Sequence, residues 1–201
     1  MSITRTRTAG EFRVHLSLIP TGYLDPSAIQ AAVREGLIYC GAATTLEHLV
    51  RPEILLKPSI LLTDPQLGRH GYTHPEVVTA TVNAVRSFAH DARVTAVTEE
   101  NFLKMPTRFL IEESGLAAIA DKNKTHMRFL SNMKTPMADY LLAKEETVHT
   151  RTVMAAELYS RANFRVYCPK IRTDSFSSGF AGAIRLGREN PVTAPNDISI
   201  C

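Results

Sequence analysis

The amino-acid sequence predicts an α/β fold, built as one domain around a mostly parallel sheet. Two observations lead to this prediction. Apolar segments with the period of strands alternate along the chain with segments of helical period, which is the order of βαβ units. Two of the strand-like segments end in a proline-containing step, Lys57-Pro58 and Pro169-Lys170, as buried strands do where they enter a loop. We therefore expect a Rossmann-like arrangement of three layers, with helices on both faces of the sheet.

The size and composition fit a single globular domain. A chain of 201 residues corresponds to one domain at about 150 residues per domain, so we assign residues 1–201 to a single α/β domain. Hydrophobic residues make up 44% and charged residues 21%, which is ordinary for a soluble globular protein and excludes a disordered chain. We expect residues 1–11 to be flexible and residues 188–201 to form an irregular tail.

The cysteines and the net charge exclude several functional classes. Cys40, Cys168 and Cys201 are odd in number and widely spaced, which argues against a disulfide framework and against zinc or iron–sulfur sites. Lys and Arg number 23 against 20 for Asp and Glu, and a net charge of +3 is too small to indicate a nucleic-acid partner. No apolar run approaches the roughly 20 residues of a membrane helix. We expect a cytoplasmic protein with no nucleic-acid or membrane partner.

The first part of the chain divides into clear elements. Residues 12–19 alternate in polarity, which indicates a strand. A helix begins at Asp25-Pro26, with the aspartate as N-cap and the proline at the first helical position. Residues 44–47 form a weaker capping box for a short helix, and residues 53–58 form a buried strand. The loop that follows, residues 59–72, is long, and loops of this length are often functional.

The clearest local signal is Thr73-His74-Pro75-Glu76. Thr73 is expected as the N-cap of a helix, with Glu76 as its reciprocal partner in a capping box. Pro75 falls in the first turn, where its missing N–H costs nothing. The apolar positions that follow keep helical spacing to about residue 89, so we expect a helix over this stretch.

The elements of the remaining chain have weaker patterns. Residues 131–150 carry no pattern that assigns them. The predicted strands cover residues 93–97, 126–130 and 163–168, and the predicted helices cover residues 106–113, 115–122 with Ser114 as cap, 151–161 and 177–187.

Basic and hydroxyl side chains follow two of the predicted strands. Lys57 ends one strand, and Lys170, Arg172 and Thr173 follow another. In parallel α/β sheets, ligands bind beyond the carboxyl ends of the strands. The helix that begins at Thr73 adds backbone N–H groups and a partial positive charge, which attract anions. The combination predicts a carboxylate or phosphate ligand, and the alternative is that the lysines are ordinary solvated residues at strand ends.

Acid–base groups are expected at the same edge of the sheet. His74 has a side chain suited to proton transfer near neutral pH. Glu99 and Glu100 follow the strand that ends at Val97, and they are candidates for a substrate contact, a general base or a metal ligand. The alternatives are an exposed histidine at a helix start and a solvated acidic loop.

Four stretches of the chain, in this order and spacing, carry a resemblance to a known family. They are Leu55 to Ile60, Tyr72 to Val78, Cys168 to Asp174 and Ser178 to Arg185. They resemble, in turn, a strand that ends in lysine-proline-asparagine, a threonine-histidine-proline-glutamate helix start, a later proline-lysine step and a small-residue stretch. These features mark the DUF362 family, a domain of unknown function. The fit extends from about residue 53 to residue 187.

The resemblance implies that Lys57, His74 and Lys170 share one site. The chain departs from the family pattern at Ser59, Asp174 and Arg185, where the family usually has Asn, His and Lys. Many relatives carry a ferredoxin-like cluster domain with closely spaced cysteines, and the cysteines of this chain lack that spacing, so cluster chemistry is not implied. Relatives also tend to continue further, so we expect a shortened site or one completed by a second subunit.

These residues favour an enzyme that acts on a small anionic metabolite. Lys57, Lys170 and Arg172 would hold a carboxylate or enolate oxygen and stabilise the charge that develops on it, and His74 would move a proton. The sequence has no GxGxxG, Walker A or GxSxG motif, so we expect no cofactor. The predicted class is a cofactor-independent isomerase, lyase or cyclase of small-molecule, including specialised, metabolism. Further substrate contacts are expected from Thr73, Thr173, Arg185 and Glu99.

Two alternatives stay open. A metal-dependent enzyme would use His74, Glu99, Glu100 and Asp174 as nitrogen and oxygen ligands, although no HExxH spacing is present. A non-catalytic binding or scaffold protein would keep the fold and lose the chemistry. In either case edge strands need cover and twofold dimers are the commonest assembly, so we also expect a homodimer.

Overall fold

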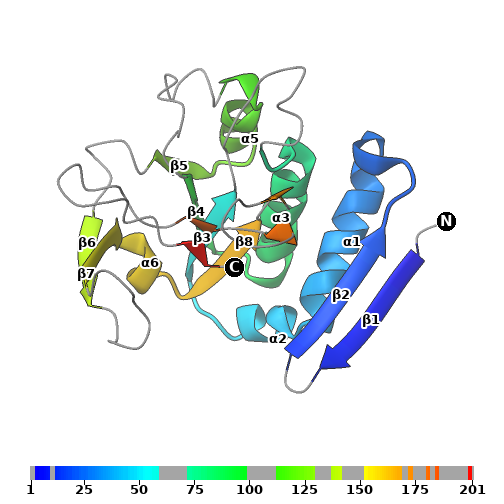
Figure 1. The fold of residues 1–201 in the computed structure, drawn as a ribbon, viewed down its shortest axis with the longest axis horizontal. Helices are drawn as coiled ribbons and strands as arrows, with labels where there is room; N and C mark the ends of the chain where they lie inside the picture. Colours follow the sequence, from blue (N-terminus) through cyan, green and yellow to red (C-terminus); the bar gives the residue numbers. More distant parts are fainter. Residues whose placement is uncertain are drawn as a thin grey trace.

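The centre of the protein is a parallel sheet (Figure 1). The computed structural model describes residues 3–9, 12–58, 72–98, 112–129, 137–141, 152–168, 172–173, 180–181, 184–185 and 199–200. The sheet contains strands β3 (Glu53–Pro58), β4 (Arg93–Thr98), β5 (His126–Phe129) and β8 (Phe164–Cys168), in the order β5-β4-β3-β8. Every neighbouring pair in it is parallel. The predicted α/β class is therefore confirmed.

Strand β3 lies in the middle of this sheet, and its sequence explains why. All residues from Ile54 to Pro58 are buried, so both faces of the strand are covered. A continuous apolar run of this kind is typical of a parallel strand between two layers. Leu56 and Ile54 belong to the main core, whereas Leu55 belongs to a smaller cluster on the opposite face. The alternation of strand side chains thus divides β3 between two cores.

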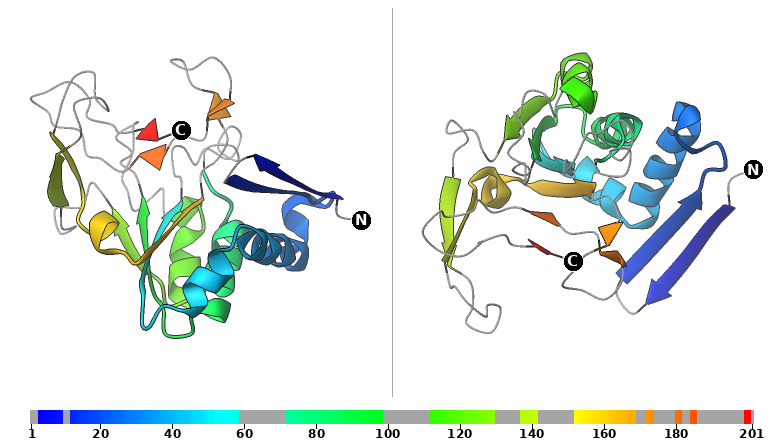
Figure 2. Two further views of the ribbon diagram at one scale, coloured as in Figure 1. Left: turned by 90° about the horizontal axis from the view of Figure 1, so that it is seen from below. Right: turned by 45° about the horizontal axis from the view of Figure 1, so that its top comes forward.

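Helices cover both faces of the sheet (Figure 2). On one face lie α2 (Ala42–Glu47), α3 (Pro75–Phe88) and α5 (Leu116–Lys122), which pack against the strands through the main core. On the other face, Leu158 of the short helix α6 (Leu158–Arg161) packs against the cluster that contains Leu55. The three-layer arrangement follows from these two clusters.

The N-terminal part of the chain forms a layer outside α3. Helix α1 (Pro26–Tyr39) packs on α3, and strand β2 (Phe12–Leu18) packs on α1. Strand β1 (Ile3–Ala9) pairs antiparallel with β2, with Ile3 opposite Leu18. We expected residues 1–11 to be flexible; Ile3–Ala9 form β1 of this hairpin, and the flexibility of the segment stays a prediction. The β-branched residues of β1 suit a strand, and their backbone bonds are supplied by β2.

Helix starts show where local signals held and where they failed. Asp25 is the N-cap of α1 as predicted, because its carboxylate accepts the N–H of Ala28 at 3.0 Å. Helix α2 begins at Ala42 rather than at the predicted box of residues 44–47, since Gly41 adopts a left-handed conformation at φ +78°.

The predicted cap of α5 is also corrected. Gly115, at φ +71°, occupies the N-cap position that we assigned to Ser114. Ser114 is buried one residue earlier. A left-handed glycine reverses the chain directly before the helix, so the hydroxyl of the preceding serine does not cap it.

Two predicted helices in the second half are wrong. Residues 152–156 of the predicted helix 151–161 form strand β7 (Thr152–Ala156), which pairs antiparallel with β6 (Met137–Leu141), and only α6 is helical. The short helix predicted over residues 177–187 is replaced, where it is described, by β10 (Phe180–Ala181) and β11 (Ile184–Arg185). In both cases cross-strand pairing outweighs local helical preference.

The remaining predicted elements are confirmed, lie outside the described residues or stay predictions. The strands at residues 12–19, 53–58, 93–97, 126–130 and 163–168 are confirmed to within a residue or two. The predicted loop at residues 59–72, apart from Tyr72, and most of the predicted helix at 106–113 lie outside the described residues. In the predicted tail, β12 (Ser199–Ile200) pairs with β11. The extent of the single domain stays a prediction. No helix within the described ranges is long and apolar enough to cross a membrane.

Candidate functional site

The sheet has a topological switch point between β3 and β8. From β3 the chain moves outward to β4 and β5, and it later returns to place β8 on the other side of β3. The connections that leave β3 and β8 therefore diverge. Lys57 is the register partner of Tyr167, and Pro58 is the register partner of Cys168, so the two strands end level with each other. In open α/β sheets, ligands bind beyond the carboxyl ends of the strands at such a point.

Lys57 brings a charged side chain to this edge. It is only 1% exposed, and it is the largest of the fully buried side chains. Its Nζ donates to the carbonyl oxygen of Pro58 at 3.2 Å, so the side chain folds toward the end of its own strand. Since Lys57 alternates with Leu56, its stem starts on the face of the sheet that α6 covers. Burial of an ammonium group is costly unless polar or charged groups compensate it, which marks this lysine as unusual.

Cys168 ends β8 on the opposite face, toward α3. Its Sγ lies 3.7 Å from the hydroxyl oxygen of Thr81. Burial raises the pKa of the Cys168 thiol to about 11, and the Thr81 hydrogen bond and the positive charge of Lys57 oppose this shift only in part. The thiol is therefore protonated at neutral pH and is a poor nucleophile. The effect of Lys57 on this pKa also means that the lysine charge acts across the sheet edge.

Thr73 has a different role from the one predicted. Its hydroxyl donates to the carbonyl oxygen of Cys168 at 2.5 Å, and both groups are buried. The bond links the start of α3 to the end of β8. Thr73 therefore does not cap α3, and the predicted capping box with Glu76 is wrong.

His74 is the N-cap of α3 instead. Its Nδ1 accepts the N–H of Glu76 at 3.2 Å, and its carbonyl oxygen accepts the N–H groups of Val77 and Val78. Pro75 occupies the first helical position and has no N–H. In the described first turn of α3, each N–H group thus already has an acceptor within the protein. The expectation that these groups face a ligand is not met in this conformation.

The imidazole ring of His74 is held in a defined plane. It stacks on the ring of Tyr23, with 3.9 Å between the ring centroids and an interplanar angle of 2°. Tyr23 belongs to the 3₁₀ turn η1 (Gly22–Leu24), between β2 and α1. Because Nδ1 accepts a hydrogen bond, the proton of the neutral ring is on Nε2. Tyr23 and the cap thus fix both the orientation of the ring and its tautomer.

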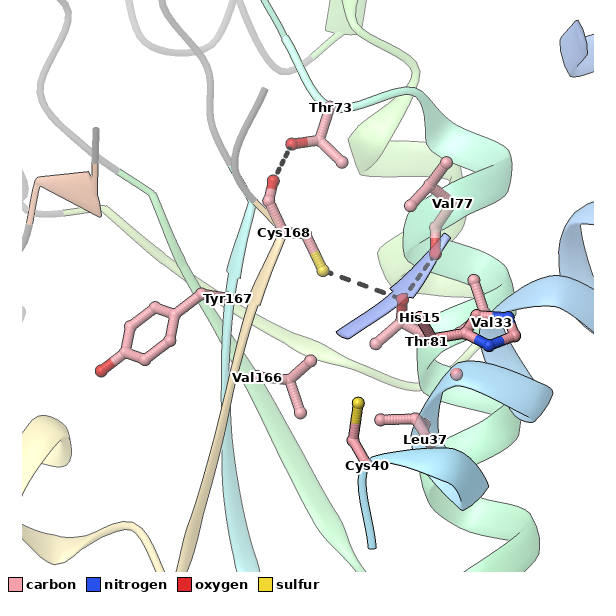
Figure 3. A pocket seen from close by; sticks show the side chains of 11 residues that line it. His15, Val33, Leu37, Cys40, Thr73, Val77, Thr81, Val166, Tyr167 and Cys168 are labelled. Carbon is pink, nitrogen blue, oxygen red and sulfur yellow. Dashed lines mark hydrogen bonds between the residues drawn. The ribbon is translucent and has the colours of Figure 1, made fainter. Parts of the chain in front are cut away.

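A pocket of about 380 Å³ lies next to this edge, between α1, α3 and β8 (Figure 3). Thr73 lies at one end of it and Cys40 at the other, and the ring of Tyr167 points away from it. Its lining residues are His15, Val33, Gly36, Leu37, Cys40, Thr73, Val77, Thr81, Val166, Tyr167 and Cys168.

The structure brings only some of the predicted residues together. Lys57 lies at the end of β3, and Thr73, directly before His74 and α3, bonds to the end of β8. That Lys57, Thr73 and His74 act in one site stays a prediction. Arg172 and Thr173 form β9, which pairs with β10, and Arg185 belongs to β11. Whether these three join the site stays a prediction. Lys170, Glu99, Glu100 and Asp174 lie outside the described residues.

Several residues of this region carried no usable signal in the sequence. Tyr23, His15 and Thr81 contact it only because distant elements pack together. Cys168 was recognisable as a strand end, but its burial was not. Within the part of the chain that the structure describes, no group of three His, Cys, Asp or Glu side chains is placed to hold a metal ion.

Comparisons with known proteins complete this description. No curated protein and no solved structure matches the chain. The sequence profile of the family described as "Domain of unknown function (DUF362)" matches residues 54–186, which is about two thirds of the chain. The matched region begins in β3 and contains the described residues at the ends of β3 and β8 and at the start of α3. The resemblance noted in the sequence is therefore confirmed, and the chain belongs to the DUF362 family.

Proposed function

We propose that the protein is a cofactor-independent acid–base enzyme, of the isomerase, lyase or cyclase type. Its substrate would be a small carboxylate- or enolate-bearing metabolite bound at the carboxyl ends of β3 and β8. The observation that carries this proposal is the burial of Lys57 at the switch point of the sheet. Buried charged groups at such positions are more often functional than those elsewhere.

Lys57 would stabilise the negative charge that develops on the substrate. A positive charge acts more strongly in a buried site than in water, because the effective dielectric constant is lower. Charge stabilisation by a fixed group is often the largest contribution to catalysis of enolate formation. The influence of Lys57 on the Cys168 thiol supports the view that its charge extends over the strand ends.

His74 would act through Nε2. Because Nδ1 accepts the Glu76 N–H, the proton of a neutral ring is on Nε2. A neutral imidazole at a helix start can donate a hydrogen bond to a carbonyl oxygen and pass its proton to the enolate oxygen. Lys57 and His74 start from opposite faces of the sheet, so a substrate over the strand ends would contact both from two sides.

The remaining contacts of this proposal come from the chain that follows β8. Lys170 and Arg172 follow Cys168 closely in sequence, and they would bind the carboxylate. Thr173, Arg185 and Glu99 are retained as further substrate contacts. We also retain the cytoplasmic location expected from the sequence. We retain a homodimer because both outer strands of the central sheet, β5 and β8, are edges in the described chain.

The test begins with native mass spectrometry of the freshly purified protein, to identify any organic acid that it retains. That acid, or a set of 2-oxo acids, is then incubated with the protein in D₂O, and exchange of the α-protons is followed by proton NMR. We expect exchange with wild type, and a loss of at least about 100-fold in Lys57→Met. Lys122→Met is the matched control, because Lys122 is an exposed residue at the end of α5.

Two outcomes would overturn this proposal in the form stated. One is full exchange activity in a folded Lys57→Met protein, which would remove Lys57 from the reaction. The other is a retained acid that binds in a Lys57-dependent manner without any exchange, which would establish a non-catalytic binding protein. The internal hydrogen bonds of Thr73 and of the first turn of α3 favour that second candidate, since they leave few groups ready for a reaction.

A further inference from the structure

We propose that the pocket between α1, α3 and β8 binds the apolar part of an amphipathic organic acid, with the carboxylate at the sheet edge beside Thr73. This inference rests on the proposed function, because the carboxylate position is the one proposed above. It adds a substrate class: a carboxylic acid with a short aliphatic or aromatic body, rather than a fully polar metabolite or a nucleotide.

The walls of the pocket determine the chemistry of this ligand. The volume of about 380 Å³ lies at the small end of the range of ligand pockets. Val33 and Leu37 of α1, Val77 of α3 and Val166 of β8 face it. Burial of an apolar group against such walls is favourable, whereas a sugar or phosphate group would lose its hydration without replacement.

The orientation of the ligand follows from the two ends of the pocket. Thr73 marks the end at the carboxyl edge of the sheet, where it bonds to Cys168. Lys57 precedes Pro58, which is the register partner of Cys168, so a positively charged residue lies beside this end of β8. Cys40, an exposed thiol at the end of α1, marks the opposite end. An anionic group is thus favoured near Thr73, and an apolar chain would run along β8 toward Cys40.

His15 is one of the polar residues that line the mostly apolar pocket, with Thr73 and Thr81. Its Nε2 lies 2.8 Å from the hydroxyl oxygen of Ser17, whereas its Nδ1 is buried and finds no hydrogen-bond partner in the described part of the chain. Because Nδ1 has almost no exposed surface, it does not face the pocket, and the proposed ligand does not depend on it.

Much of this pocket is built by residues outside the family match. His15 and the lining residues of α1 precede residue 54, where the match begins. Gly36 allows the close approach of α1 and β2, because a Cβ at this position would lie 3.3 Å from Cδ2 of His15. The N-terminal segment therefore adds a wall to an edge that the family domain provides. We infer that it selects the apolar part of the substrate.

The test uses Cys40 as a reporter in the full-length protein. The rate at which N-ethylmaleimide alkylates Cys40 is measured by peptide mass spectrometry, with acetate, butanoate, pentanoate or hexanoate present. We expect hexanoate to slow alkylation about tenfold at ten times its Kd, because occupied protein is protected. From butanoate to hexanoate, each CH₂ should lower the half-protecting concentration about fourfold, which corresponds to about 0.8 kcal/mol. Acetate should not protect.

Matched variants connect this protection to the pocket. Val33→Phe places a larger side chain in the pocket and should abolish protection by hexanoate. Ile38→Phe is the control, because Ile38 is 46% exposed on the same helix and does not line the pocket. Circular dichroism confirms that both variants fold. Equal protection in both variants, or no protection of wild type by hexanoate, would overturn the pocket proposal.

Lys57→Met separates this inference from the proposed function. We expect it to weaken protection by hexanoate and to leave protection by uncharged hexanol unchanged. If hexanoate protects Lys57→Met as well as wild type, the pocket proposal is supported and Lys57 does not bind the anion. The opposite result is also possible: protection does not increase with chain length, but binding of the acid found by native mass spectrometry still requires Lys57. The pocket proposal is then wrong, and the proposed function is retained.

Discussion

The hydroxyl of Thr73 donates a hydrogen bond to the carbonyl oxygen of Cys168, 95 residues later in the chain. It joins the segment directly before α3 to the last residue of β8, at the switch point of the strand order between β3 and β8. Both residues are buried, so water does not replace the bond if it is lost. The geometry of the candidate site therefore depends on one contact that no local pattern encodes.

Replacing Thr73 with valine removes this donor and keeps the shape of the side chain. The carbonyl oxygen of Cys168 then stays buried without its partner, and we expect a loss of about 1–3 kcal/mol in the free energy of unfolding. Urea unfolding measures it. Thr45→Val is the control, since the Thr45 hydroxyl bonds to a backbone carbonyl at an exposed position. A loss in Thr73→Val no larger than in this control would contradict the prediction.

Two substitutions of His74 separate its N-cap hydrogen bond from the proton-transfer role proposed for its ring. His74→Ala removes the acceptor for the Glu76 N–H and should destabilise the protein by about 1 kcal/mol. His74→Asn restores an N-cap acceptor and should recover most of this loss. The asparagine variant still lacks the Nε2 proton, so it should also lose the α-proton exchange expected of wild type. Equal stability of the two variants in urea would show that the cap contributes nothing, and full exchange by His74→Asn would exclude a role for the ring.

Two signals that depend on neighbouring residues alone predicted their elements correctly. Asp25 before Pro26 starts a helix because the cap and the fixed proline angle act within one turn. The apolar run at 53–58 indicates a covered strand for the same local reason. In contrast, Thr152–Ala156 became a strand because it pairs with Met137–Leu141, and this partner cannot be identified from either segment alone.

Two residues of the candidate site lie where the sequence placed them, whereas their contacts differ from the prediction. Lys57 and Thr73 were expected at the carboxyl edge, and they lie there. The cap moved by one residue, from Thr73 to His74, because the threonine hydroxyl found a better partner across the sheet. Tyr23 and His15 come from a segment whose packing on α1 and α3 is a tertiary property, so no sequence pattern indicated them.

The buried thiol of Cys168 predicts a pH dependence of stability. Burial raises its pKa from 9.0 to about 11, so between these values the unfolded chain loses the thiol proton while the native chain keeps it. The native state then binds more protons, and stability falls as the pH rises. The contribution is complete below about pH 9 and is lost by about pH 11. The difference between these two pKa values corresponds to roughly 3 kcal/mol in the free energy of unfolding.

Cys168→Ala gives the measurement. Free energies of unfolding of wild type and variant are compared in urea at several pH values from 8 to 11. The advantage of wild type over the variant should shrink across this range, because only wild type has the buried thiol. Parallel profiles would show that the thiol is not held protonated by burial.

Two left-handed glycines test how closely α5 contacts the start of α3. Gly115 has φ +71°, and a Cβ there would lie 3.3 Å from Cγ of Pro75, whereas Gly22 has φ +58° and a Cβ there would have no atom within 4 Å. Gly22→Ala should therefore show only the backbone cost, about 1–2 kcal/mol. Gly115→Ala should lower the free energy of unfolding in urea by more than this, because the rigid ring of Pro75 must also move. It should also weaken the His74 cap next to that ring, and an equal loss in the two variants would show that the contact with α5 does not position the start of α3.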